Sequence, residues 1–316
     1  MGRYLIRRLL AAIPVMLMVA TAVFMLLFLA GGDPASVILG PDARPEQVED
    51  LRVKLGLDQP LHVQVYRWYA RLLQGDLGQS IFLNRPVTQA IAERAEPTLI
   101  LTTLALLVAL SIGLPMGILS ALRRGQWLDT GAMFVAIGGV SMPTFWLGLN
   151  LIFVFGVVLA WLPVAGYESL SKGLWDNLRY MIMPAVTLGM AQGALLARLT
   201  RSMMLETLSE DYVRTARAKG LAERRVVAAH ALRNAMIPLL TIIGLIFAAL
   251  MGGAVITEQV FNIPGVGRLL IQAVTRRDYP VVQGVVLVVA GLYVLINLVV
   301  DVLYGYLDPR LRYGRA

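Results

Sequence analysis

The chain has 316 residues, of which 58% are hydrophobic and 15% charged, and its mean hydropathy is +0.70. Soluble domains carry about 45–50% apolar and about 25% charged residues, so the composition excludes a large soluble core and indicates a polytopic membrane protein. The formal net charge of +8 is explained by basic residues flanking membrane spans, and we expect no nucleic-acid partner. Cysteine is absent, which excludes disulfides, thiolate metal sites and a cysteine nucleophile.

The chain starts with a basic segment containing Arg3, Arg7 and Arg8 and then runs without a charge from Leu9 to Gly32. The apolar region of a secretory signal peptide has only about 7–15 residues, whereas a membrane-spanning helix needs roughly 20. We therefore predict that residues 1–32 form a cytosolic start and a retained first transmembrane helix.

Residues 33–96 differ in character, because charges of both signs, prolines and glycines replace the apolar run. Two short amphipathic helices are predicted, over Pro45–Leu55 and Leu61–Leu73, since their apolar residues have helical spacing. Turn-forming residues lie between and after them, at 57–60 and 75–78. We expect a small, folded extracytoplasmic insert.

Five further uncharged runs predict five more transmembrane helices in a core domain of residues 97–316. In the second span, Gly113 and Gly117 have the spacing of small residues that lets helices approach closely. In the third, Pro143 is expected to kink the helix. The fold class is thus all-α, with six transmembrane helices. The five later spans are predicted over Pro97–Leu122, within Thr130–Tyr167, and over Tyr180–Ala197, Asn234–Thr257 and Tyr279–Val300.

Basic residues set the orientation, because Lys and Arg accumulate in cytosolic loops. They are frequent near the N-terminus, between spans two and three, after span four and in the C-terminal tail, which carries Arg310, Arg312 and Arg315. Both termini and the loop at 211–238 are therefore predicted to be cytosolic.

No familiar catalytic motif is present. The sequence has no GxxxxGK[ST] phosphate loop, and its only histidines, His62 and His230, form no cluster, so we expect no catalytic residues and no metal site. The spans lack interior charges, which argues against an ion-driven carrier. Glu258 and Asp301 are predicted to lie at the membrane interface rather than to relay protons. Energy for any transport is therefore expected from a partner.

The loop DYVRTARAKGLAERRVVAAHALRNAMIP, residues 211–238, is the longest charged, helix-prone stretch in the second half of the chain. It predicts a helix, a tight turn and a second helix, because Gly220 is the residue best able to take the left-handed conformation that ends a helix. On charge alone, a partner-binding loop and a solvated basic loop near anionic lipid are equally supported.

Arg214–Gly220 resembles the EAA loop of ABC-importer permeases, the loop that docks into their ATP-binding subunits. YVRTARAKGL followed by HALRNAMIP is similar to the dipeptide/oligopeptide/nickel branch, and the resemblance covers essentially the whole chain. Other segments that fit this branch are Arg7–Leu10, Gly32–Pro34, Leu55–Leu61 with Trp68, Gly75–Ser80, Glu258–Gly267, Asp278–Pro280 with Gln283 and Gly284, and Leu307–Arg310.

The loop also departs from the general pattern of the family. Arg214 stands where a Glu is usual, Thr215 replaces the first Ala, and Ala222 stands where a Ser would cap the second helix. Losing such a cap typically costs about 0.5–2 kcal/mol of helix stability. We therefore expect the docking helix to depend on its partner for order.

The resemblance implies an ABC type I importer permease that forms half of a translocation pathway for short peptides. Its implied partners are a homologous second permease subunit, two ATP-binding subunits that bind ATP and Mg, an extracytoplasmic substrate-binding protein and membrane lipid. The chain itself is expected to hold no cofactor and not to be an enzyme. Within a coupling loop at 201–235, the residues assigned to ATPase coupling are Arg214, Thr215, Ala216, Lys219, Gly220, Leu221, Ala222, Glu223 and Arg224.

Two further groups of residues are candidates for the pathway. Glu258, Phe261, Pro264 and Gly265 are candidates for an outer gate or a contact with the binding protein, although a loop that merely folds well is equally supported. Candidate pathway-lining residues, chosen as polar residues in or beside spans, are Ser141, Thr144, Asn150, Gln192 and Asn297.

Two alternatives stay open. The importer could carry non-peptide cargo, such as a nickel chelate, glutathione or another small solute, and an ion-driven secondary transporter is the less favoured alternative.

Overall fold

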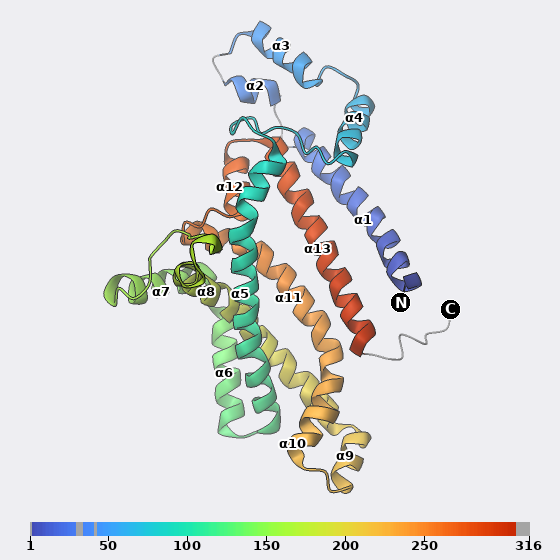
Figure 1. Cartoon of the computed structure of the whole chain (residues 1–316), viewed down its shortest axis with the longest axis vertical. Helices are drawn as coiled ribbons and strands as arrows, with labels where there is room; N and C mark the ends of the chain where they lie inside the picture. Colours follow the sequence, from blue (N-terminus) through green and yellow to red (C-terminus); the bar gives the residue numbers. More distant parts are fainter. Residues whose placement is uncertain (1, 30–33, 41–42, 308–316) are drawn as a thin grey trace. The chain divides into compact units, whose positions relative to one another are not determined.

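The structure, a computed structural model, describes residues 2–29, 34–40 and 43–307, and these residues are helical apart from loops and one isolated antiparallel bridge between Gln79 and Pro86 (Figure 1). They divide into two compact units. The core unit comprises residues 2–5, 96–268 and 295–307, and the insert unit comprises residues 6–95 and 269–294.

Thirteen α-helices are described, together with two π-helical segments and one 3₁₀ turn. Helices α5 and α13 each begin in the insert unit and continue in the core unit. The helices that begin before residue 97 are α1 (Gly2–Leu29), α2 (Pro34–Leu39), α3 (Pro45–Leu55), α4 (Leu61–Leu73) and α5 (Val87–Leu122). The later elements are α6 (Trp127–Ser141), α7 (Thr144–Leu151) with its π-helical continuation Ile152–Val158, the 3₁₀ turn Leu170–Lys172, α8 (Leu174–Ser209), α9 (Asp211–Ala218), α10 (Glu223–Arg225), the π-helix Val226–Leu232, α11 (Arg233–Val260), α12 (Val266–Thr275) and α13 (Tyr279–Leu307).

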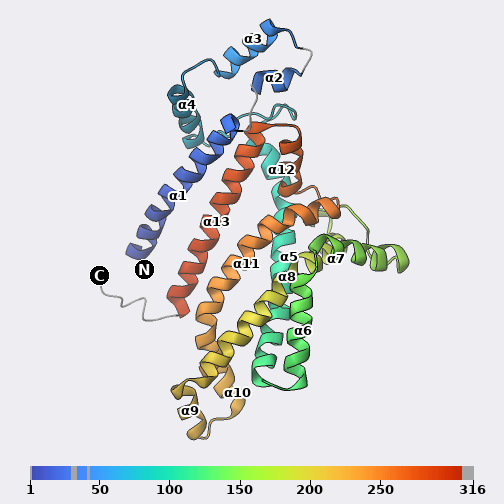
Figure 2. The ribbon, with the colours of Figure 1, turned by 180° about the vertical axis from the view of Figure 1, so that it is seen from behind.

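The centre of the core unit is an apolar cluster supplied by α5, α8 and α11, with Leu101, Leu196 and Leu250 all fully buried. Helices α5 and α6 run side by side in both ribbon views, and α8 packs against both α6 and α11 (Figures 1 and 2). A Cβ added at Gly117 of α5 would lie 2.6 Å from the Ala197 carbonyl oxygen of α8. Gly113 makes a similar approach, so the predicted role of this glycine pair in helix packing is confirmed.

In the insert unit, α4 packs against the second half of α1 and the first half of α13, around Ala20, Val23 and Leu287. The rings of Phe24 and Trp68 lie 5.3 Å apart between centroids. The two short helices predicted in the insert are confirmed with the same bounds, as α3 and α4. Gly56, φ +71°, ends α3, and its N–H donates to carbonyls of the last turn.

The predicted third span is broken, as expected, at Pro143. The preceding helix α6 and the following helix α7 with its π-helical end are bent by 99° relative to each other across the break. Five helices of the described residues are long and apolar enough to cross a membrane, and the bent pair brings the number to six.

The helix that contains the predicted fourth span is longer than that span, whose bounds were placed at the nearest charges. The structure has a continuous helix of 36 residues there, α8, which extends well beyond Tyr180–Ala197 at both ends. Charged residues end an apolar run but not a helix, since Arg is a good helix former. Helix α5 likewise begins ten residues before the predicted second span, at Val87.

Several sequence assignments lie outside the described residues. They are the end of the predicted first span at 30–32, Asp33 at the start of the insert, and the tail motif Asp308–Arg310 with Arg312 and Arg315.

Candidate functional site

The predicted coupling loop forms a helical hairpin at the end of α8. Only Glu210, in an extended conformation (φ −67°, ψ 147°), separates α8 from α9. Gly220 then adopts φ +75°, the left-handed conformation expected at the turn. Both ribbon views show α9 and α10 beside each other beyond the ends of α8 and α11 (Figures 1 and 2).

A small apolar cluster holds the hairpin closed. Val213 and Val226 are fully buried and Ala216 nearly so, and Leu208 and Leu221 pack against them. Ala216 and Leu221 are therefore the inward-facing members of the predicted coupling set. The other seven are exposed, and they are Arg214, Thr215, Lys219, Gly220, Ala222, Glu223 and Arg224.

An ion pair that was not among the sequence predictions bridges the turn. The Arg217 Nε and Nη2 atoms donate to the Glu223 carboxylate oxygens at 3.1 and 2.7 Å. The interaction with Glu223 raises the pKa of the Arg217 guanidinium above its ordinary value. Arg224 and Lys219, by contrast, have no ion pair with any described residue, so their charges face solvent.

The second helix of the hairpin differs from the prediction of a separate short helix. Glu223–Arg225 continues through the π-helix Val226–Leu232 into α11, giving one apolar helical segment from Glu223 to Val260. No Gly or Pro interrupts residues 223–232, which explains the continuity. As expected, Ala222 at the N-cap provides no side-chain cap. The second helix of the hairpin is therefore continuous with the fifth span.

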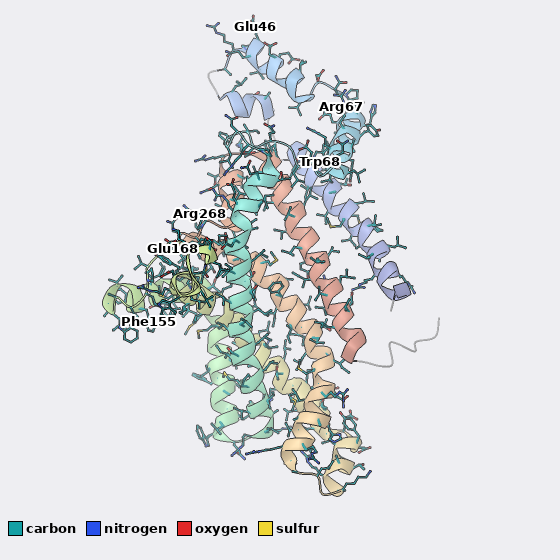
Figure 3. All side chains as sticks on the ribbon, in the orientation of Figure 1. Glu46, Arg67, Trp68, Phe155, Glu168 and Arg268 are labelled. Carbon is teal, nitrogen blue, oxygen red and sulfur yellow. The ribbon has the colours of Figure 1, made fainter. Side chains whose placement is uncertain are left out.

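A buried carboxylate lies near the C-terminal end of α11, the end away from the hairpin. Glu258, which was predicted at the membrane interface rather than in a proton relay, has a fully buried side chain. The Thr98 hydroxyl donates to one carboxylate oxygen at 2.6 Å, and the Arg268 backbone N–H donates to the other at 2.8 Å. Thr98 in turn accepts the Val266 N–H at 2.8 Å. These bonds connect α11 to α5 and to the start of α12, near the Arg268 labelled in Figure 3.

The other candidates for an outer gate follow Glu258 in the chain, in the loop after α11. A Cβ at Gly265 would overlap the Glu258 carboxylate, so only glycine fits there. Phe261 is buried, and its carbonyl oxygen accepts the Gly166 N–H at 2.9 Å. Pro264 is exposed. The loop after α11 is therefore closely fitted to the core unit.

The five candidate pathway residues are dispersed over the core unit, and no hydrogen bond joins any two of them in the part of the chain that the structure describes. Ser141 and Asn150 are exposed, and each donates to a carbonyl of its own helix, at Ile137 and Trp146. The remaining three are partly buried, and they are Thr144, Gln192 and Asn297.

Sequence reasoning missed a polar cluster between the end of α5, the start of α6 and the second half of α8. Asp129 is buried and accepts two hydrogen bonds from Arg201, one from Ser120 and one from the Gly125 N–H. The two charged residues are 72 positions apart, and each looked like an ordinary charge beside a span. Only covariation between the two positions would have indicated the pair.

A second missed interaction lies in the insert unit. Asp278, buried before α13, accepts a 2.5 Å hydrogen bond from the Ser80 hydroxyl, although 198 positions separate them. Both residues belong to segments that the family resemblance singled out. The sequence therefore pointed to these segments without showing that they meet.

Comparison with known proteins agrees with this architecture. Residues 113–313 match the family described as binding-protein-dependent transport system inner membrane component, and residues 1–102 match its N-terminal companion. A probable peptide ABC transporter permease of Sinorhizobium fredii is 47% identical over 314 residues, covering 99% of this chain and 100% of that protein.

Two more relatives and one solved structure extend the comparison. A putative peptide transport system permease of Brucella abortus and a glutathione transport system permease of Salmonella paratyphi A are each 48% identical over 99% of this chain and 100% of their own lengths. An inward-facing structure of the MetNI methionine ABC transporter has a chain with a TM-score of 0.58 and 19% identity, covering 70% of this chain and 97% of its own. That likeness shows a shared fold. The chain therefore belongs to the binding-protein-dependent inner membrane components, the multi-span permease subunits of bacterial ABC importers.

Proposed function

We propose that this chain forms half of an ATP-driven pathway for short peptides and is coupled to ATP-binding subunits through the hairpin at 211–238. The observation that carries the proposal is the hairpin itself, whose two helices are joined at a left-handed glycine and whose second helix is continuous with α11. A hairpin closed by its own apolar cluster moves as a rigid body, which suits it to pass a displacement of an ATPase to the spans. Its outward-facing Arg214, Lys219 and Arg224 suit an acidic partner surface.

The proposed assembly has this permease beside a homologous second one, with two ATP-binding subunits that bind ATP and Mg and carry out hydrolysis. A substrate-binding protein delivers the cargo from outside. Both termini are cytosolic, residues 33–96 lie on the extracytoplasmic side, and residues 97–316 form the core domain. In this assembly, the loop from Glu258 to Gly265 is the outer gate or the contact with the binding protein, and Ser141, Thr144, Asn150, Gln192 and Asn297 line the pathway.

Cargo is proposed from the relatives. Those from Sinorhizobium fredii and Brucella abortus are named for peptides, and the similarly related Salmonella protein is named for glutathione. Glutathione is itself a tripeptide, so a pathway for short peptides suits either. Glutathione is therefore the second candidate cargo.

The test is ATP-dependent uptake of labelled di- and tripeptides, including glutathione, into vesicles containing the complete importer. A Cβ added at Gly220 would meet nothing within 4 Å in this chain. Gly220→Trp therefore affects the backbone turn and the docking surface but no internal packing. Gly220→Asn is the matched control, because Asn tolerates the left-handed conformation and is small. We expect the Trp variant to lose uptake while the Asn variant keeps most of it.

Equal uptake by both variants and the unmodified importer would remove the hairpin turn from coupling. Uptake without ATP would contradict the importer mechanism itself. If glutathione is transported and other peptides are not, the pathway is specific and the glutathione candidate is favoured. ATP hydrolysis that continues without uptake of any of these compounds would contradict the peptide cargo.

A further inference from the structure

A cavity of about 730 Å³ lies within the insert unit, and none of the residues assigned above to coupling, gate or pathway lines it. Its walls come from the end of α1, the facing parts of α3 and α4, the loop after α4 and the first turn of α13. Figure 3 labels two of the lining residues of α4, Arg67 and Trp68.

The cavity lies beside the start of a candidate span. Tyr279, on one wall, is the first residue of α13 and of the candidate span Tyr279–Leu303, and Phe24, on another, lies in the second half of α1. The boundary between hydrocarbon and headgroups is expected at this depth. Trp68 and Tyr66, which also line the cavity, are the aromatic types enriched at that boundary.

One wall of the cavity is a stripe of hydrogen-bond donors on α4. Gln64, Arg67 and Arg71 follow one another at helical spacings of three and four, so they share a face of the helix, and Gln74 follows as its C-cap residue. Gln64 already donates to two carbonyls of the loop before α4, at 3.2 and 2.8 Å. The guanidinium groups of Arg67 and Arg71 have no ion pair with any residue that the structure describes.

The remaining walls are mostly apolar. Phe24 and Trp68 contact each other there, and Leu77 and Ile81 complete the surface. The one acidic residue in the lining is Asp76, and one of its oxygens accepts the Gly78 N–H at 2.8 Å. Two guanidinium groups against one carboxylate leave a net positive charge beside an apolar surface.

We propose that this cavity binds an anionic phospholipid, with its phosphate held by Arg67 and Arg71 and the start of an acyl chain against Phe24, Trp68 and Leu77. Guanidinium groups bind phosphate through paired hydrogen bonds, and two in reach of one cavity favour an anionic headgroup over a zwitterionic one. The apolar wall at the depth of the membrane boundary assigns the phosphate to a lipid rather than to a soluble ion. In the orientation proposed above, this lipid belongs to the outer leaflet.

Native mass spectrometry of the intact importer, released from nanodiscs of equal phosphatidylglycerol and phosphatidylcholine, tests the proposal. The unmodified importer is expected to retain phosphatidylglycerol preferentially. Arg67→Gln with Arg71→Gln should lower its retention about tenfold, since hydrogen bonds to charged groups are among the strongest. Arg67→Lys with Arg71→Lys keeps the charges and should retain most of the preference.

The matched control is Arg276→Gln with Arg277→Gln, an equal loss of charge at two exposed residues of the same unit. It should leave retention unchanged. Three results would overturn the proposal: equal retention of both lipids by the unmodified importer, equal effects of the two glutamine pairs, or displacement of the bound lipid by glycerol phosphate alone. If the Arg67/Arg71 change weakens association with the binding protein while lipid retention is unaffected, the stripe is a protein contact and the lipid site is wrong.

Discussion

The guanidinium of Arg201 donates two hydrogen bonds to the carboxylate of Asp129, from Nε to one oxygen at 2.6 Å and from Nη2 to the other at 2.8 Å. The Asp129 side chain is only 6% exposed and that of Arg201 27%, so water screens the pair poorly. The Ser120 hydroxyl and the Gly125 N–H donate to the same carboxylate, so the Asp129 side chain connects α6 to α8 and to the end of α5. Helix α8 is followed after one residue by the hairpin at 211–238, so this pair also fixes the helix from which the hairpin begins.

Arg201→Gln should therefore destabilise the permease strongly. Removing one partner of a buried ion pair leaves an unpaired charge and costs about 3–5 kcal/mol, and the partial exposure of Arg201 places the expected loss at about 3 kcal/mol. The measurement is the apparent melting temperature of the purified complex. Arg198→Gln, an exposed arginine one turn earlier on α8, is the control and should have little effect.

The same pair predicts a coupling between mutations. Asp129→Asn combined with Arg201→Gln removes both charges, so the double variant should lose less stability than the two single losses added together. Additive losses would show that Arg201 stabilises α8 by packing alone and not through Asp129.

Gly265→Ala should destabilise the loop after α11. Its Cβ would overlap the Glu258 carboxylate, which is already fixed by Thr98 and by the Arg268 N–H. Overpacking of this kind typically costs about 1–3 kcal/mol. We expect a lower melting temperature and faster proteolysis of the loop. Gly252→Ala is the control within α11, because a Cβ there meets nothing within 4 Å; an equal effect of both changes would contradict the steric explanation.

Gly117→Val should force α5 away from α8. A Cβ at this position would already lie 2.5 Å from the Thr200 Cβ and 2.6 Å from the Ala197 carbonyl oxygen, and valine adds two methyl groups. The cost is expected at the upper end of about 1–3 kcal/mol, because backbone atoms cannot move aside as a flexible side chain can. Thermal unfolding measures it, and Gly131→Val, at a position of α6 with open space, corrects for the lower helix propensity of valine.

The sequence contained enough information to predict the helices and the hairpin, but not the contacts between distant residues. Apolar runs and turn residues are local signals, and they sufficed for α3, α4, the break at Pro143 and the left-handed Gly220. The family resemblance marked Glu258 and Asp278 without indicating their partners. The pairs Glu258–Thr98, Asp278–Ser80 and Arg201–Asp129 depend on tertiary packing between residues far apart in the chain, so no local sequence pattern predicts them. The bounds of helix α8 were missed for a different reason, because Arg179 and Arg198, which bounded the predicted fourth span, end an apolar run without ending the helix.

Ala222→Ser should make the coupling hairpin less dependent on its partner. Ala222 is the N-cap of the helix that starts at Glu223, and it has no side-chain oxygen to accept the unpaired N–H groups of the first turn. A serine hydroxyl would supply that acceptor, and such caps contribute about 0.5–2 kcal/mol. We expect slower amide hydrogen exchange over residues 221–229 in the isolated permease, while the complex with ATP-binding subunits changes little. Ala218→Ser, which adds the same hydroxyl at the end of α9, is the control. If exchange in the unmodified chain is equally slow with and without the ATP-binding subunits, the hairpin is ordered by its own contacts, including the Arg217–Glu223 pair, and the missing cap has no consequence for docking.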